Sequence, residues 1–251
     1  MLWHSFVPSE FLFGMIMPLL KDEHCGASRI EMYRGITLPC VVSKLFESVL
    51  VHLFHDSLNS DELQFGFKKN SSWCHALFVF NESVKYFVKH GSRVHCAALD
   101  ASKAFDKVLH HGLFYKMLCK RVPAMLVNIL IYWYSHLHCA VLWKSVLGEN
   151  FSVKCGVRPG GVLSPYLFSL YVDDVINDVR KSSYGIYVGN VFTGCICMQT
   201  ILFYSLVATV VCSKWWIFVQ NMGLRWTLDS TLLKATVLVL VVVIHLHLVF
   251  C

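Results

Sequence analysis

A short apolar run that ends in an acidic residue constrains this chain more than any other feature. Residues 94–99 are almost continuously apolar, over a length that suits a buried strand better than a helix. Asp100 follows directly, so we expect its carboxylate at the carboxyl end of that strand, where open sheets place ligand groups. A carboxylate there can hold Mg²⁺, which prefers one or two protein carboxylates together with substrate phosphates. An N-cap role at the start of the following helix explains Asp100 equally well.

The residues around Asp100 form a longer pattern. Leu99 to Val108 read L-D-A-S-K-A-F-D-K-V, which resembles the block L-D-x-x-K-A-F-D-x-V of the reverse-transcriptase domain of non-LTR (LINE-type) retrotransposons. The resemblance implies that Asp100 is a catalytic metal ligand and that Phe105 lies under the sugar of the incoming nucleotide and excludes ribose. It also implies an α+β fold with the fingers and part of the palm of a right-handed polymerase, a twisted antiparallel sheet backed by helices.

Upstream stretches extend the resemblance into the fingers. The apolar run that ends at Lys21 and the stretch from Tyr33 to Leu38 are similar to the opening of that region. Gln64 to Lys69 resembles the Q-x-G-F block, in which a glycine between two aromatic residues permits close backbone approach. With this resemblance, Lys68 is expected to contact a phosphate. The alternative is a pair of solvated lysines after a turn.

A second block follows at residues 156–165, where G-V-R-P-G-G-V-L-S-P is similar to the family's G-V-R-Q-G-G-x-L-S-P. The resemblance implies that Gly160 packs near the nucleotide base. Ser164 and Pro165 suit the cap and first turn of a helix. Pro159 stands where the family has glutamine, so an amide side chain and a backbone N–H donor are both lost, which places nucleotide binding there in doubt.

Apolar periodicity predicts most of the remaining elements. Residues 41–58 are expected to form an amphipathic helix whose apolar stripe belongs to the core; the stripe is Val42, Leu45, Phe46, Val49, Leu50 and Leu53. Further helices are expected at 73–89 and 110–120 and around a stripe of Leu126, Ile129, Leu130, Trp133 and Leu137. A hairpin of residues 139–146 and 151–157 is expected to turn at 148–150, with Phe151, Val153 and Cys155 pointing inward.

Tyr171-Val172-Asp173-Asp174 spells the Y-x-D-D signature of a reverse-transcriptase active site, but its spacing indicates a helix. Apolar residues recur from Leu167 to Val179 on one helical stripe, which leaves Asp173 and Asp174 on the other side. A catalytic pair must instead lie at the tip of a hairpin beside Asp100. We therefore expect Asp173 and Asp174 to be surface acids.

The catalytic box is expected after strands at 184–188 and 191–194, but residues 195–201 read C-I-C-M-Q-T-I, and no acid occurs between Asp178 and Asp229. One aspartate cannot complete a two-metal centre. If Cys197 to Ile201 are encoded TGT-ATG-CAG-ACG-ATA, reading from the last base of the first codon gives Tyr-Ala-Asp-Asp. A frame shift near residues 194–197 is therefore the favoured explanation, with the chain truncated relative to the family and a thumb absent.

The end of the chain, residues 235–251, is almost wholly apolar. Seventeen residues are the short limit for a membrane span, so a tail anchor is one hypothesis, and out-of-frame translation with no selected fold is the favoured one. The first residues lack a basic leader and a cleavage site, so no signal peptide is expected. Eleven cysteines form no C-x-x-C pair, which fits a reducing, intracellular location in cytoplasm or nucleus.

The net charge of +6 suits a polyanionic partner. We expect a fingers-like segment at 1–90, a palm-like segment at 91–194 and a degenerate apolar tail at 195–251. The resemblance implies RNA-directed DNA polymerisation by two-metal nucleotidyl transfer, with Mg²⁺, an RNA template, a DNA primer and dNTP. We expect this chain to be inactive. The alternatives are a non-catalytic nucleic-acid-binding remnant and a membrane protein attached through residues 235–251.

Overall fold

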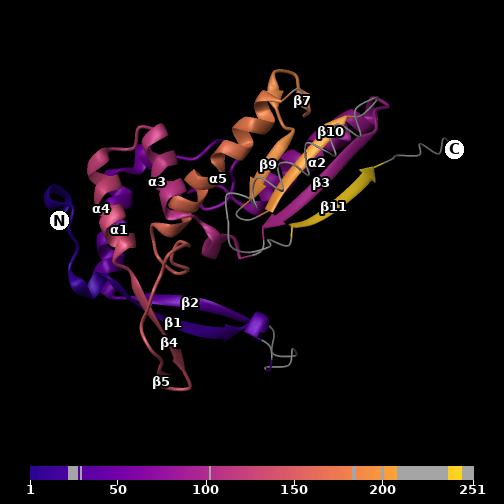
Figure 1. The fold of residues 1–251 in the computed structure, drawn as a ribbon. Helices are drawn as coiled ribbons and strands as arrows, with labels where there is room; N and C mark the ends of the chain where they lie inside the picture. The colour runs from indigo at the N-terminus through magenta and orange to yellow at the C-terminus, as the bar shows by residue number, and fades with distance from the viewer. Residues whose placement is uncertain are drawn as a thin grey trace. The chain divides into compact units, whose positions relative to one another are not determined.

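A computed structural model describes residues 1–21, 28, 30–101, 103–182, 185–198, 201–207 and 237–244 (Figure 1). The chain forms two compact units, and each is built from two separate stretches. Unit 1 joins Met1–Asn59 to Phe105–Tyr171, and unit 2 joins Ser60–Ala104 to Val172–Cys251. These units divide the chain at other positions than the segments 1–90, 91–194 and 195–251, which therefore remain a proposal about function.

The sheet of unit 1 is mixed. Its path runs β2-β1-β4-β5, with β6 also paired to β4, and β1 and β4 pair in parallel while the other pairs are antiparallel. This parallel pair departs from the expected antiparallel sheet, although the α+β class is confirmed. The strands are β1 (Phe13–Leu20), β2 (Tyr33–Pro39), β4 (His138–Trp143), β5 (Val146–Leu147) and β6 (Phe151–Ser152).

The predicted hairpin at residues 139–157 turns at a different place. β4 turns back into β5 through Lys144 and Ser145, whose φ angles of 46° and 68° suit the primed turns that match strand twist. β6 is a two-residue edge strand, and both Phe151 and Cys155 are exposed. The predicted inward alternation was therefore wrong, because a pairing this short leaves no continuous face to bury.

The helices of unit 1 enclose its core. All five residues of the stripe predicted between Leu126 and Leu137 are buried, and the Trp133 indole N–H donates a 2.9 Å hydrogen bond to the Phe11 carbonyl. The helices are α1 (Val41–Leu53), α3 (His110–Cys119), α4 (Ala124–Ser135) and the first part of α5 (Ser164–Lys181), and short 3-10 helices lie at Leu2–His4, Ser9–Phe11, Ile30–Met32, His55–Leu58 and Ala104–Lys107.

Helix α1 buries only part of its predicted apolar stripe. Leu50 is buried and Phe46 is half-buried, as predicted, but the other four members are exposed, so that part of the prediction was wrong. Val42 and Leu45 are 60% and 65% exposed, whereas Ser43, Glu47 and Leu50 form the buried face. The reason is electrostatic. Glu47 forms an ion pair with the buried Arg158, and an ionic partner in the interior decides which face of the helix turns inward.

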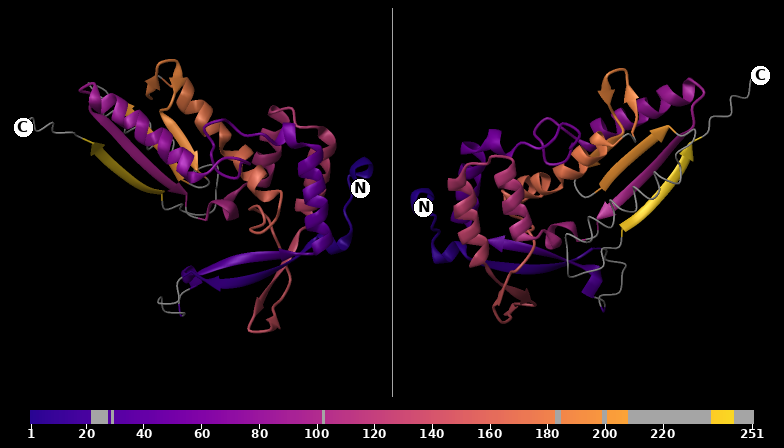
Figure 2. Two further views of the ribbon diagram at one scale, coloured as in Figure 1. Left: turned by 180° about the vertical axis from the view of Figure 1, so that it is seen from behind. Right: turned by 45° about the horizontal axis from the view of Figure 1, so that its top comes forward.

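Unit 2 is built on an antiparallel sheet with the order β11-β3-β10-β9. Helix α2 (Trp73–Lys89) lies along this sheet, as the view from behind shows (Figure 2), and Val84 and Val88 pack there against Val94 and Cys96. The strands are β3 (Val94–Ala101), β9 (Cys195–Met198), β10 (Ile201–Val207) and β11 (Val237–Ile244), with a separate hairpin of β7 (Tyr187–Val188) and β8 (Val191–Phe192).

Part of the apolar tail takes part in the sheet of unit 2. Residues 237–244 form β11, which pairs with β3 along all eight residues, from Val237 opposite Ala101 to Ile244 opposite Val94. Residues 235–236 and 245–251 lie outside the described residues. Within the described part of the chain, none of the helices has both the length and the apolar character that a membrane crossing needs.

Candidate functional site

The end of β3 meets a hairpin in unit 2. Asp100 is the last residue but one of β3, and its backbone pairs with Ile201 of β10. Ile201 also pairs with Met198 at the end of β9, so the start of β10 lies between the end of β9 and Asp100. The predicted strand and hairpin are confirmed in position. Residues 195–207 contain no carboxylate, so Asp100 is the one acid that these three strands contribute at this end.

Asp173 and Asp174 lie on α5, as predicted, and not on a hairpin. Asp174 is half-buried, but Asp173 is only 2% exposed, so its assignment as a surface acid was wrong. Both carboxylate oxygens of Asp173 accept hydrogen bonds from the backbone N–H of Asp61, at 3.1 and 3.0 Å. A partner so distant in the chain gives no local signal, and helical periodicity alone therefore places Asp173 on the solvated side.

Asp61 is the centre of this network. Its carboxylate accepts two hydrogen bonds from the Arg180 guanidinium, both 2.8 Å, and one of 2.9 Å from the backbone N–H of Leu63. Burial raises the pKa of Asp61, but these hydrogen bonds outweigh it and hold the pKa below the ordinary 3.8. The Asp61 carboxylate is therefore ionised in the folded protein at neutral pH.

Lys68, the predicted phosphate contact, belongs to the same network. Its ammonium donates a 2.5 Å hydrogen bond to the carbonyl of Asp61. Burial lowers the pKa of Lys68, whereas the carboxylates of Asp173 and Asp61 favour its charged form. The Lys68 side chain is half-buried, so part of it remains accessible.

Phe105 lies in unit 1. Its ring stacks on that of Phe168 of α5, with centroids 4.7 Å apart and planes 17° from parallel. The Phe105 carbonyl accepts a 2.8 Å hydrogen bond from the N–H of Val157, which ties this residue to the loop of residues 156–163. The side chain is half-buried. The structure thus joins Phe105 to the same loop that contains Gly160.

Gly160 occupies a position that only glycine fits. Its φ is +100°, and a Cβ atom there would lie 2.8 Å from the carbonyl oxygen of Thr37. The neighbouring Pro159 carbonyl accepts a 2.9 Å hydrogen bond from the N–H of Thr37, so the loop is held against β2. The glycine is required here by contact with the protein's own backbone, whatever ligand binds.

A buried ion pair that sequence reasoning missed holds the same loop. Arg158 and Glu47 are 5% and 2% exposed, and the Arg158 guanidinium donates to one Glu47 oxygen while it lies 4.6 Å from the ring centre of Trp133. The second Glu47 oxygen accepts a 3.0 Å hydrogen bond from the N–H of Leu163. The only sign of this ion pair in the sequence is Glu47, a charged residue opposite the apolar stripe of the predicted helix at 41–58.

The four predicted site residues therefore fall two in each unit. Phe105 and Gly160 are connected through the 156–163 loop of unit 1. Asp100 and Lys68 belong to unit 2, where Asp100 pairs with β10, β10 pairs with β9, and Cys197 of β9 bonds to the segment that leads to Lys68.

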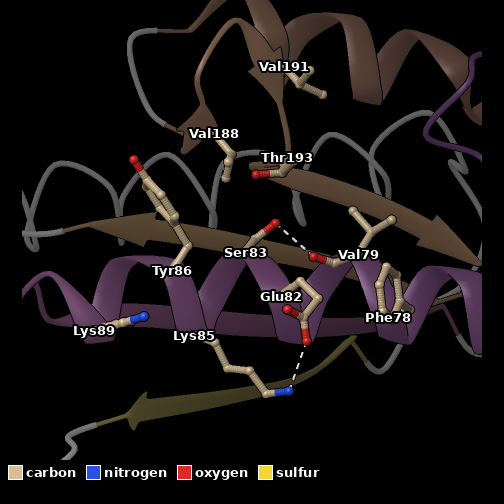
Figure 3. A pocket seen from close by; sticks show the side chains of 10 residues that line it. All are labelled: Phe78, Val79, Glu82, Ser83, Lys85, Tyr86, Lys89, Val188, Val191 and Thr193. Atoms are coloured by element: carbon tan, nitrogen blue, oxygen red, sulfur yellow. Dashed lines mark hydrogen bonds and ion pairs between the residues drawn. The ribbon is translucent and has the colours of Figure 1, made fainter.

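A separate cavity of about 640 Å³ lies between α2 and the β7–β8 region of unit 2 (Figure 3). Its walls are mainly apolar, and its polar part includes the Glu82–Lys85 ion pair and the Ser83 hydroxyl, which donates to the Val79 carbonyl. Its lining includes none of the four predicted site residues. The residues are Phe78, Val79, Glu82, Ser83, Lys85, Tyr86, Lys89, Val188, Val191 and Thr193.

Comparison with known proteins agrees with these motifs. A model of the family "Reverse transcriptase (RNA-dependent DNA polymerase)" matches residues 21–199. The chain is 27% identical over 167 residues to the Retrovirus-related Pol polyprotein from type-2 retrotransposable element R2DM of Drosophila melanogaster, covering 66% of this chain and 16% of that one. It is 30% identical over 179 residues to the probable RNA-directed DNA polymerase from transposon X-element of the same species, covering 68% and 19%.

Solved structures share the fold at low sequence identity. Apo telomerase from Candida tropicalis, truncated from its C-terminal domain, superimposes with a TM-score of 0.65 at 12% identity, over 95% of this chain and 51% of that one. Telomerase from Candida albicans in complex with the TWJ fragment of telomeric RNA gives a TM-score of 0.55 at 13% identity, over 95% and 43%. The chain thus spans about half or less of these structures and less than a quarter of the curated relatives.

Proposed function

Because the chain belongs to the reverse transcriptase (RNA-dependent DNA polymerase) family, we propose that it provides a fingers and palm framework that binds nucleic acid without completing the catalytic metal centre. The non-LTR retrotransposon relatives support a template RNA, a DNA primer and dNTP as the ancestral partners. Membership of this family supports an intracellular location, in cytoplasm or nucleus.

The proposal that this chain is inactive rests on one observation. Residues 198–201 of the sequence, between the strands β9 and β10, read M-Q-T-I and include no acid. Family members use divalent metal ions, and two Mg²⁺ ions that bridge a phosphoryl group need several anionic oxygens. Among the described strands of the unit 2 sheet, Asp100 is the one carboxylate residue, so this donor set does not fit that pair of ions. The Asp173 carboxylate is engaged with another segment, since both of its oxygens accept hydrogen bonds from the backbone N–H of Asp61.

The other site residues keep roles in binding. The partly exposed ring of Phe105, tied to the 156–163 loop, supports its position under the sugar of a nucleotide. Gly160, without a Cβ atom, supports close approach to a base. The half-buried Lys68 supports a phosphate contact, and Lys69 next to it adds a second positive charge.

A primer-extension and binding assay tests this function. The full chain is mixed with an RNA template annealed to a DNA primer, with dNTP and Mg²⁺, and both extension and fluorescence anisotropy are measured. We expect salt-sensitive binding with no extension above background, and Asp100→Asn should leave the affinity unchanged. A designed Gln199→Asp/Thr200→Asp variant supplies the missing carboxylates, and Gln199→Asn/Thr200→Asn is its uncharged control.

Two results would contradict the proposal. Mg²⁺-dependent extension by the natural chain that survives Asp173→Ala and is lost with Asp100→Ala would show a working centre. The lack of any salt-sensitive binding to the primer–template would show that the framework no longer recognises nucleic acid. Extension by the carboxylate-restored variant alone would support the incomplete centre directly.

A further inference from the structure

The segment of residues 61–68 is joined to β9 by one isolated bridge. The Leu63 carbonyl accepts a 2.9 Å hydrogen bond from the N–H of Cys197, and the Cys197 carbonyl accepts another of 2.9 Å from the N–H of Phe65. Gln64 therefore forms a parallel bridge with Cys197. The segment that resembles the Q-x-G-F block is thus attached by its backbone to the hairpin beside Asp100.

The backbone hydrogen bonds around Gln64 alone do not fix the direction of the 61–68 segment. Further restraints on this segment come from α5. Asp173 holds the Asp61 N–H with both oxygens, at 3.1 and 3.0 Å. Arg180, further along the same helix, donates hydrogen bonds to both oxygens of the Asp61 carboxylate and a 3.2 Å hydrogen bond to the side-chain oxygen of Asn177. Asp61 is therefore held from α5 at its backbone and at its side chain.

The far end of the segment closes back on its start. The Lys68 ammonium donates to the carbonyl of Asp61, so the ends of the 61–68 segment are linked to each other. Asp173 and Asp61 are the carboxylates whose charges favour the Lys68 ammonium most. The position of the Lys68 charge therefore depends on where Asp61 is held.

We propose that Asp173 is a positioning residue, which orders the 61–68 segment on β9 and thereby fixes Lys68 for contact with a nucleic-acid phosphate. This gives a structural role to Asp173 of the Y-V-D-D sequence of α5. The phosphate contact of Lys68 rests on the proposed function, whereas the ordering of the segment does not.

An aspartate and an asparagine differ at this position in acceptors and in charge. Asp173 shares the single Asp61 N–H between two oxygens, whereas an asparagine offers one acceptor oxygen and one N–H₂ donor. The substitution therefore removes one of the two acceptors and the negative charge near Lys68. Asp173→Asn keeps the volume and the helix, so its effect reports the loss of acceptor and charge alone.

Hydrogen exchange of the full chain tests the ordering. We expect Asp173→Asn to increase the exchange rate of the backbone amides of Leu63, Phe65 and Gly66 by at least about tenfold, since local opening replaces a well-ordered segment. Asp174→Asn, one residue further along the same helix, is the matched control and should leave these amides protected. Protection across α4 in unit 1 should be the same in both variants, which shows that the fold is intact.

A binding measurement tests the consequence for Lys68. The affinity for a primer–template is measured against salt for Asp173→Asn, Lys68→Met and the double variant. Removal of one phosphate contact lowers the slope of log affinity against log salt by about 0.7–0.9. We expect both single variants to lose this amount, and the double variant to lose no more, because Asp173 acts through Lys68.

Different results would contradict the positioning role of Asp173 and the phosphate contact of Lys68. If the 61–68 amides exchange equally in Asp173→Asn and Asp174→Asn, Asp173 does not position the segment. If exchange rises but Lys68→Met leaves the salt slope unchanged, the ordering is supported and the contact of Lys68 with phosphate is wrong. Should Asp173→Asn not fold, Asp173→Ser removes the same carboxylate from the Asp61 N–H with a smaller side chain. Unchanged exchange in a folded Asp173→Ser variant would then overturn the proposal.

Discussion

The backbone conformation at Gly160 and the space around it both require a glycine. Its positive φ and the 2.8 Å approach of a Cβ atom to the Thr37 carbonyl leave no room for alanine. We expect Gly160→Ala to lower the free energy of unfolding by about 2–4 kcal/mol, the sum of left-handed backbone strain and overpacking. Urea unfolding followed by circular dichroism measures this difference.

Gly91 is the matched control for that substitution. Its φ is +80°, and a Cβ atom there meets nothing within 4 Å. Gly91→Ala should cost only the backbone strain, about 1–2 kcal/mol. Equal losses for the two variants would mean that contact with Thr37 does not constrain the 156–163 loop.

At the scale of elements, the Glu47–Arg158 pair joins α1 to the 156–163 loop. Arg158 Nη1 is buried without a hydrogen-bond partner in the described part of the chain, so the pair is costly to bury and more costly to break. We expect Glu47→Leu alone to destabilise the fold by about 3–5 kcal/mol, because it leaves an uncompensated buried charge. Glu47→Leu combined with Arg158→Met should recover most of this loss.

A double-mutant cycle in urea measures the coupling between these two residues. Glu82→Leu combined with Lys85→Met removes an exposed ion pair on α2 and is the control, with an expected coupling within about 1 kcal/mol. If the effects of Glu47→Leu and Arg158→Met are additive, the two side chains do not act as a pair in solution.

At the scale of the whole molecule, the tail separates two hypotheses. Pairing of β11 with β3 predicts that the loss of residues 235–251 exposes a sheet edge, lowers Tm and promotes aggregation. A chain of this size loses about 2–4 °C of Tm for each kcal/mol. Thermal unfolding and sedimentation with lipid vesicles are compared for the full chain and the deletion.

A shorter deletion, of residues 245–251, retains β11 and provides the control, with little expected change in Tm. The membrane-anchor hypothesis predicts a different pattern. It would be favoured if the longer deletion left Tm unchanged and abolished sedimentation with vesicles. The frame-shift hypothesis is independent of both results, and sequencing the DNA across codons 190–235 tests it.

The sequence by itself determined the elements and the family. The apolar run of β3, the stripe of α4 and the helical spacing around Asp173 are local periodicities, and each was confirmed. The motifs at Leu99–Val108 and Gly156–Pro165 are local as well, and the family match confirms the family that they indicate. Neighbours within a few residues decide such features, so a linear pattern is sufficient to predict them.

Only the tertiary structure decided which charges are buried. Glu47 and Arg158 are 111 positions apart, and Asp61 and Asp173 are 112 apart, so no local pattern connects either pair. With these partners, the Glu47 face of α1 and the Asp173 side chain are buried. The physical reason is that an ionised group enters a protein interior only where its partners already converge, and convergence is a property of the folded chain.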